Sequence, residues 1–115
     1  MTTLEMIREW HLARGFRDVG YHYVIERNGA IRCARPIQVP GAHAKGHNHD
    51  SIGICCVGNN LDPDEKWDQA QQDGLRRLIE ALRLVWPELE IFAHREVGQT
   101  ACPGLTGDEV RQICG

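Results

Sequence analysis

The chain has 115 residues, enough for one domain with a hydrophobic core of its own, and we expect a single domain over residues 1–115. It carries 13 basic and 16 acidic residues, and the net charge of −3 gives no electrostatic basis for binding nucleic acid or an anionic membrane. No apolar run approaches the roughly 20 residues that span a bilayer.

The cysteine count and the N-terminal residues point to a reducing compartment. There are five cysteines, an odd number, and two of them are adjacent at Cys55 and Cys56. This arrangement argues against a secreted disulfide framework. Met1 to Glu5 also lack the basic start and apolar stretch of a signal peptide. We therefore expect synthesis in the cytoplasm.

The first part of the chain predicts a helix followed by a β-hairpin. Thr2 and Glu5 have capping-box spacing, and apolar residues follow at helical intervals, which predicts a helix over residues 4–14. The β-rich residues 21–25 and a return strand at 30–35 flank an Asn-Gly pair, a strong hairpin signal. These elements should open an α/β domain.

The middle of the chain predicts a long loop, a buried strand and a second helix. Residues 36–50 are rich in glycine, histidine and asparagine, and long ordered loops in small domains are usually functional. Residues 51–58 are nearly all apolar, as in a strand covered on both faces. A helix should then begin at Trp67 or Asp68, with one apolar stripe formed by Leu75, Leu78, Ile79, Leu82 and Val85.

The last part predicts a short strand and a terminal helix. Residues 90–94 read as a strand, and Thr106 and Glu109 form a second capping box that should begin a brief helix. Strands alternating with helices predict an α/β fold with a mixed central β-sheet flanked by helices.

A histidine and a cysteine close to the C-terminus suggest a metal site. His94 ends the predicted strand, and a turn-rich segment leads from it to Cys102. Imidazole nitrogen and thiolate sulfur are both good zinc ligands. On spacing alone, a partly exposed histidine and a buried free thiol explain the pair better than a metal site does.

Several motifs, taken in order, resemble one enzyme family. They are Trp10-His11, Gly15-Phe16, Asp18-Val19-Gly20-Tyr21-His22-Tyr23, Gly41-Ala42-His43-Ala44-Lys45-Gly46, Asn48-His49-Asp50-Ser51-Ile52-Gly53, Ala93-His94-Arg95-Glu96 and Cys102-Pro103. This series is similar to the zinc-dependent N-acetylmuramoyl-L-alanine amidases, the family that includes the peptidoglycan recognition proteins. The resemblance implies their fold, and hydrolysis of the amide between N-acetylmuramic acid and the L-alanine of the stem peptide.

The resemblance also implies roles for individual residues. His94 and Cys102 match two of the family's zinc ligands, and Tyr21 matches its catalytic tyrosine. Thr100 occupies a position where relatives carry lysine or threonine, and it is a second candidate catalytic residue. Positions that line the substrate groove are matched by His43 and Asn48, and the neighbouring Lys45 would suit the carboxylates of stem peptides. In relatives the first zinc histidine lies on a strand upstream of the opening helix, where this chain has no counterpart.

The third zinc ligand could come from another histidine of the chain. His22 neighbours Tyr21 on a strand, so it should face the core if Tyr21 faces the cleft. His43 is the best remaining candidate, although a substrate contact suits it better. The remaining cysteines (Cys33, Cys55, Cys56 and Cys114) are expected to be core or incidental thiols.

The sequence is compatible with two functions. One is an endolysin-like, zinc-dependent amidase that acts at the bacterial cell wall, with peptidoglycan as its partner. The other is a catalytically silent peptidoglycan-binding domain without a complete zinc site. We expect a monomer, with pairing at a bare sheet edge as the alternative.

Overall fold

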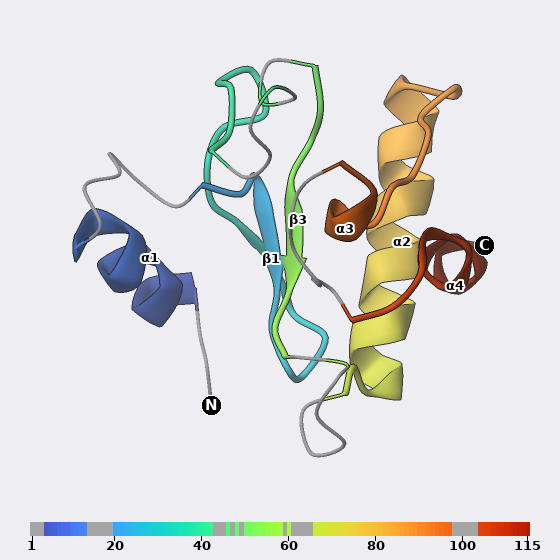
Figure 1. The fold of residues 1–115 in the computed structure, drawn as a ribbon, viewed down its shortest axis with the longest axis horizontal. Coiled ribbons are helices and arrows are strands. Elements are labelled where there is room, and N and C mark those ends of the chain that lie inside the picture. Colours follow the sequence, from blue (N-terminus) through green and yellow to red (C-terminus); the bar gives the residue numbers. More distant parts are fainter. Residues whose placement is uncertain are drawn as a thin grey trace.

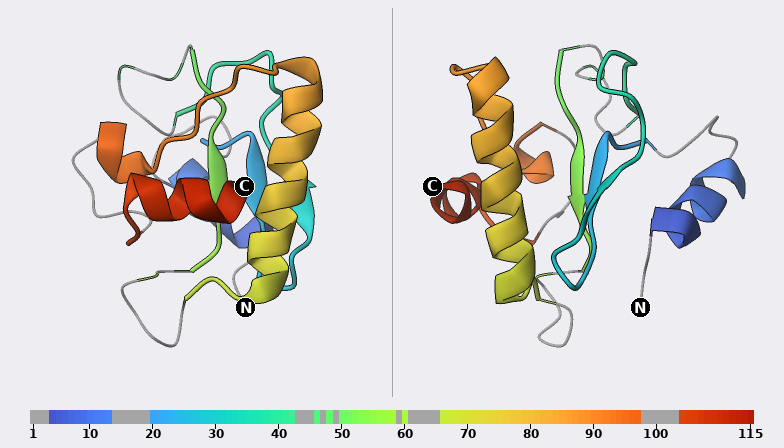
Figure 2. Two further views of the ribbon diagram at one scale, coloured as in Figure 1. Left: turned by 90° about the vertical axis from the view of Figure 1, so that its right-hand side faces the viewer. Right: turned by 180° about the vertical axis from the view of Figure 1, so that it is seen from behind.

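The computed structural model describes residues 4–13, 20–42, 46, 48, 50–58, 60, 66–97 and 104–115. Within these residues the molecule has three layers (Figures 1 and 2). Helix α1 (Leu4–Ala13) lies on one face of a central sheet, and α2 (Gln69–Val85) and α4 (Gly107–Cys114) cover the other face. No helix in the described part of the chain is long and apolar enough to cross a membrane.

The sheet is mixed, as predicted. Its order is β2-β1-β3, where β1 is Tyr23–Ile25, β2 is Ile31–Cys33 and β3 is Ile54–Cys56. Strand β2 returns antiparallel to β1 through the predicted hairpin, and β3 runs parallel to β1 after a long connection. Each strand is shorter than the sequence predicted, because the flanking residues bend into loops.

Two hydrophobic clusters hold the layers together. Because adjacent strand residues point to opposite faces, Val24 packs toward α1 and Ile25 packs toward α2. Both side chains are fully buried. The α1 cluster consists of Leu4, Ile7, Val24 and Val57, whereas the larger cluster on the other face includes the buried stripe of α2 and Val110 of α4.

Local signals account for most helix boundaries. Helix α1 covers Leu4–Ala13 of the predicted 4–14, and residue 14 lies outside the described residues. Asp68 caps α2 by accepting from the backbone N–H of Gln71 at 2.9 Å, and Thr106 caps α4 by accepting from the N–H of Glu109 at 3.1 Å. Both caps are complete capping boxes, so the prediction at residues 106–109 is confirmed. The predicted cap at Thr2 lies outside the described residues.

Two expectations were wrong. Residues 90–93 form no strand, and His94 instead begins the four-residue helix α3 (His94–Val97). No described strand pairs with this segment, and two of its backbone groups bond to side chains instead: the Ile91 carbonyl accepts from Arg111 and the Ala93 N–H donates to Glu96. Val85 does not join the buried stripe of α2; it is 65% exposed at the last turn, beyond the reach of the core.

Candidate functional site

Tyr21 lies in a short segment that is hydrogen-bonded to the loop after β2. The Gly20 carbonyl accepts from the N–H of Ala42 at 2.9 Å, and the Tyr21 carbonyl accepts from the N–H of Arg35 at 3.1 Å. The backbones of Gly20 and Ala42 lie so close together that a Cβ on residue 20 would lie 2.4 Å from the Ala42 carbonyl oxygen. Only glycine fits this position without moving the loop backbone.

A bulge at the start of β1 sets the direction of the Tyr21 side chain. The N–H groups of His22 and Tyr23 both donate to the Gly53 carbonyl, at 2.9 and 3.2 Å. Two residues opposite one residue is the pattern of a β-bulge, which redirects neighbouring side chains. As a result, Tyr21 packs half-buried against the α1 cluster, on the same face as Val24.

His22 lies in the protein interior, the position predicted for it. It is 1% exposed, and both ring nitrogens are engaged. Nε2 lies 2.7 Å from the Val39 carbonyl oxygen, and the N–H of Gly53 donates to Nδ1 at 3.0 Å. A ring with both nitrogens occupied has no lone pair for a metal, so His22 does not supply a third ligand.

Asn48 belongs to the same bonded unit as Tyr21. Its carbonyl accepts from the N–H of Gly41 at 3.3 Å, next to the Ala42–Gly20 bond. Asn48 is half-buried. The structure therefore connects two of the predicted site residues through one loop. The other two loop candidates, His43 and Lys45, lie outside the described residues.

His94 is held from a different part of the fold. It is half-buried at the first position of α3, directly after the buried Ala93. Among the described residues, none hydrogen-bonds to its ring. Helix α3 lies on the β3 side of the sheet, next to α4 (Figures 1 and 2). Cys102 and Thr100, which follow it in the sequence, lie outside the described residues.

A brace formed by Glu96 and Arg111 fixes α3 to α4. The carboxylate of Glu96 accepts from Arg111 through both oxygens, at 3.0 and 3.2 Å, and from the N–H of Ala93 at 2.8 Å. The Arg111 bonds, followed by the Ala93 bond, hold the pKa of Glu96 below its usual range. A Cβ at Gly107 would lie 2.1 Å from this carboxylate, so the glycine makes room for the brace.

Sequence reasoning did not predict this brace. Glu96 belongs to the motif that begins at Ala93, but its role there was not identified. Arg111 lies on a predicted helix, where a charged residue is usually solvated. A signal was present in the acidic residue two positions after His94, but spacing alone does not select Arg111 among the chain's basic residues.

The described residues do not assemble a metal site by themselves. No group of three or more His, Cys, Asp or Glu residues capable of holding an ion occurs in that part of the chain. Of the two predicted ligands, only His94 is among the described residues. The zinc site therefore remains a prediction.

Two buried cysteines are unsuited to chemistry. Burial raises the pKa of the Cys56 thiol far above its usual range and also raises that of Cys114. A protonated, buried thiol is a poor nucleophile. These two therefore serve as core residues, whereas Cys33 is exposed and Cys55 is partly buried.

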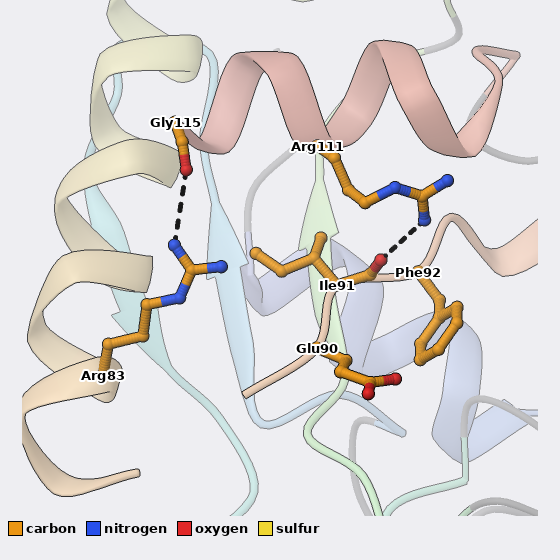
Figure 3. Close-up of a pocket in the computed structure, with 6 residues that line it drawn as sticks. All are labelled: Arg83, Glu90, Ile91, Phe92, Arg111 and Gly115. Atoms are coloured by element: carbon orange, nitrogen blue, oxygen red, sulfur yellow. Dashed lines mark hydrogen bonds between the residues drawn. The ribbon is translucent and has the colours of Figure 1, made fainter. Parts of the chain in front are cut away.

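A surface hollow of about 390 Å³ lies elsewhere, between the end of α2, residues 90–92 and α4 (Figure 3). Both of its arginines bond to backbone carbonyls: Arg83 donates to Gly115 at 3.4 Å and Arg111 to Ile91 at 2.8 Å. None of the predicted site residues lines it. Its arginines serve the packing of the C-terminal segment, so the hollow is not the candidate site.

Comparisons with known proteins agree with the motifs. Residues 2–105 match the family model described as N-acetylmuramoyl-L-alanine amidase. The endolysin of Escherichia phage T7 is 43% identical over 103 residues, which is 86% of this chain and 68% of that protein.

Solved structures agree with the predicted fold. The N-acetylmuramoyl-L-alanine amidase LysC from Clostridium intestinale superposes with a TM-score of 0.87 at 32% identity, covering 97% of this chain and 75% of that one. A point mutant of Drosophila peptidoglycan-recognition protein LB, in complex with tracheal cytotoxin, superposes with a TM-score of 0.81 at 29% identity, covering 93% of this chain and 65% of that one. These matches confirm the mixed α/β fold of the amidases and peptidoglycan recognition proteins.

Proposed function

Because this chain belongs to the N-acetylmuramoyl-L-alanine amidase family, we propose that it is an endolysin-like hydrolase of peptidoglycan. The bond cleaved is the amide between the lactyl group of N-acetylmuramic acid and the L-alanine of the stem peptide. The observation that carries this proposal is the family match over residues 2–105, which includes every candidate site residue. Peptidoglycan is therefore its binding partner, and the bacterial cell wall its place of action.

His94 and Cys102 are the proposed zinc ligands. An imidazole and a thiolate suit this ion, and the described surroundings of His94 leave its ring without a competing hydrogen bond. Bound zinc supplies Lewis acidity, which polarises a carbonyl and brings the pKa of water toward about 7. A catalytic zinc ion takes three protein ligands, so one donor beyond these two completes the set.

The remaining residues bind and orient the substrate. Tyr21 and Thr100 carry hydroxyl groups that can donate to the oxygen on which negative charge develops, and removing one such donor typically costs about 3 kcal/mol in the barrier. Neither hydroxyl titrates near neutral pH in water, so both suit donation better than general-base catalysis. His43, Lys45 and Asn48 would hold the glycan and stem peptide across the cleft. Of these proposed roles, those of Tyr21 and Asn48 are supported by the hydrogen-bonded loop that connects the two residues.

The test is release of free L-alanine amino termini from purified cell walls in the presence of zinc. The wild-type protein should release them, and Cys102→Ala should abolish the release. Cys33→Ala is the matched control, because that thiol is exposed on β2 and assigned no role. Equal turnover by wild type and Cys102→Ala would contradict the zinc role. Wall binding without release would instead identify a catalytically silent binding domain.

Metal content tests the ligands independently of turnover. Elemental analysis after dialysis should find one zinc per chain in the wild type and in Cys33→Ala, and much less in His94→Ala and Cys102→Ala. Equal zinc in all four proteins would contradict the proposed ligands.

A further inference from the structure

His22 has an unusual environment for a strand histidine next to a candidate catalytic residue. It is 1% exposed, and its ring joins two backbone groups that lie far apart in the sequence. The Val39 carbonyl can only accept, so Nε2 carries the proton that it receives. The Gly53 N–H can only donate, so Nδ1 is unprotonated. The two bonds together require the neutral Nε2–H tautomer.

The ring therefore cross-links three segments. The first is the Tyr21 segment itself, the second is the loop that leads to Asn48, and the third is the entry to β3. Backbone bonds strengthen the same junction: the His22 N–H donates to the Gly53 carbonyl, and the His22 carbonyl accepts from the Ala34 N–H. His22 and Gly53 thus exchange two hydrogen bonds at the bulge that directs Tyr21.

We propose that His22 is a positioning residue, whose neutral ring holds Tyr21 and the described part of the loop after β2 (residues 36–42 and Asn48) in their working arrangement. This inference rests on the proposed function, because it assumes that Tyr21 and Asn48 act on peptidoglycan. The two hydrogen bonds of the ring have different roles. The Gly53 bond fixes the bulge and hence Tyr21, whereas the Val39 bond fixes the loop that carries the substrate contacts.

Two conservative variants test the roles of these two hydrogen bonds separately. In His22→Asn the side-chain oxygen can take the place of Nδ1 and accept from Gly53, but nothing reaches Val39. In His22→Gln the side-chain amide can take the place of Nε2–H and donate to Val39, but the N–H of Gly53 loses its acceptor. Each variant keeps one bond and removes the other.

The experiment measures steady-state kinetics on a soluble N-acetylmuramoyl-peptide at a temperature well below melting. Losing the Val39 bond should loosen substrate binding, so His22→Asn should raise KM about tenfold with kcat nearly unchanged. Losing the Gly53 bond should displace Tyr21, so His22→Gln should lower kcat about tenfold with a smaller change in KM.

Gln71→Met is the control for a purely structural cross-link. Gln71 is fully buried, its amide donates to the Val57 carbonyl at 2.7 Å, and its oxygen accepts from Arg27 at 3.0 Å. These bonds lie beyond the C-terminal ends of β1 and β3, at the opposite end of the sheet from His22. Gln71→Met should lower the melting temperature and leave both kinetic constants at wild-type values.

The outcomes distinguish the two proposals. If the wild type turns over substrate and both His22 variants match it in KM and kcat, the positioning role is overturned while the amidase function stands. The same conclusion follows if both variants change only the melting temperature, as Gln71→Met does. A folded, zinc-loaded wild type without turnover overturns the proposed function and this inference with it.

Discussion

The two halves of the candidate site are held by different kinds of interaction. Tyr21 and Asn48 lie in a network of backbone hydrogen bonds that joins residues 20–22, the loop after β2 and the entry to β3. His94 lies on a single turn of helix after residues 90–93, which pair with no described strand. That turn is held mainly by side chains, through Glu96 and Arg111.

This difference indicates which changes each half should tolerate. A backbone network depends little on side-chain identity, except where the chains approach too closely for a Cβ or where a buried side chain such as His22 takes part. A side-chain brace depends on the charge and reach of two residues, and it weakens when either is altered or when α4 shifts. We therefore expect the half with Tyr21 to be disrupted most by substitution of Gly20. The half with His94 should be disrupted most by changes to the brace between Glu96 and Arg111.

The largest effect is expected from Gly20→Ala. The new Cβ would meet the Ala42 carbonyl oxygen at 2.4 Å, and a backbone atom cannot rotate away. Overpacking of this kind costs about 1–3 kcal/mol of stability. The displaced loop should also move Tyr21, and a shift of about 1 Å at a reacting group can cost roughly 100-fold in activity. Urea unfolding and amidase assays on the same protein measure both effects.

Gly29→Ala is the matched control for that variant. Its Cβ would meet another backbone carbonyl, that of Ala70, at 2.6 Å, and its φ of +86° adds strain for any residue with a side chain. The site lies at the hairpin, at the opposite end of the sheet. Gly29→Ala should lose at least as much stability and keep its activity below the melting temperature. A parallel loss of activity would show that general destabilisation explains the result for Gly20→Ala.

Gly107→Ala tests the other half in the same way. Its Cβ would lie 2.1 Å from the Glu96 carboxylate, but the clash is with a side chain that can move. We therefore expect a loss near the lower end of about 1–3 kcal/mol. Moving Glu96 should break its bonds to Arg111 and release α3. The zinc retained per chain should therefore fall clearly, although the free energy of unfolding falls only by this small amount. Zinc content that is unchanged after dialysis would contradict a role for the brace in holding His94.

Local signals in the sequence predicted the fold well, and the reason is physical. Helix caps at Asp68 and Thr106 and the turn at Asn28 act between residues a few positions apart, so their spacing is visible in the sequence. Residues 90–93 have strand-like composition, but a strand also needs a partner with unpaired backbone groups. Whether such a partner is present depends on which segment packs beside β3 in the fold, and the sequence pattern does not predict this.

The candidate site divides in the same way. The burial of His22 followed from strand alternation, but the bulge that sends Tyr21 toward α1 depends on Gly53, 32 positions away from Tyr21 in the chain. The brace between Glu96 and Arg111 likewise joins two separate elements. Motif resemblance named the site residues, whereas the contacts that position them came only from the fold.

The two capped helices offer a comparison with a smaller expected effect. Removing either cap, with Asp68→Ala or Thr106→Ala, should cost about 1 kcal/mol, because each side chain satisfies an N–H at a helix start. Helix α4 carries Arg111, whereas α2 carries no candidate site residue. At equal loss of stability, only Thr106→Ala should lower zinc retention and activity. Equal effects of both variants on activity would contradict a specific role of α4 in holding the candidate site.

The smallest effect is expected from Glu96→Gln, and it should depend on pH. The pKa of Glu96 in the folded protein is lowered, chiefly by Arg111 and then by the Ala93 N–H. A carboxylate with a lowered pKa stabilises the fold at pH values above its unfolded pKa of about 4.3, and this contribution disappears as the pH falls through the folded value. The wild type should therefore melt a little above Glu96→Gln at pH 7. That difference should shrink below about pH 4 and also in high salt, because the pair is partly exposed to solvent. Thermal melts from pH 7 to pH 3 measure it, and a difference that stays constant over this range would mean that the charge on Glu96 does not hold α3 in place.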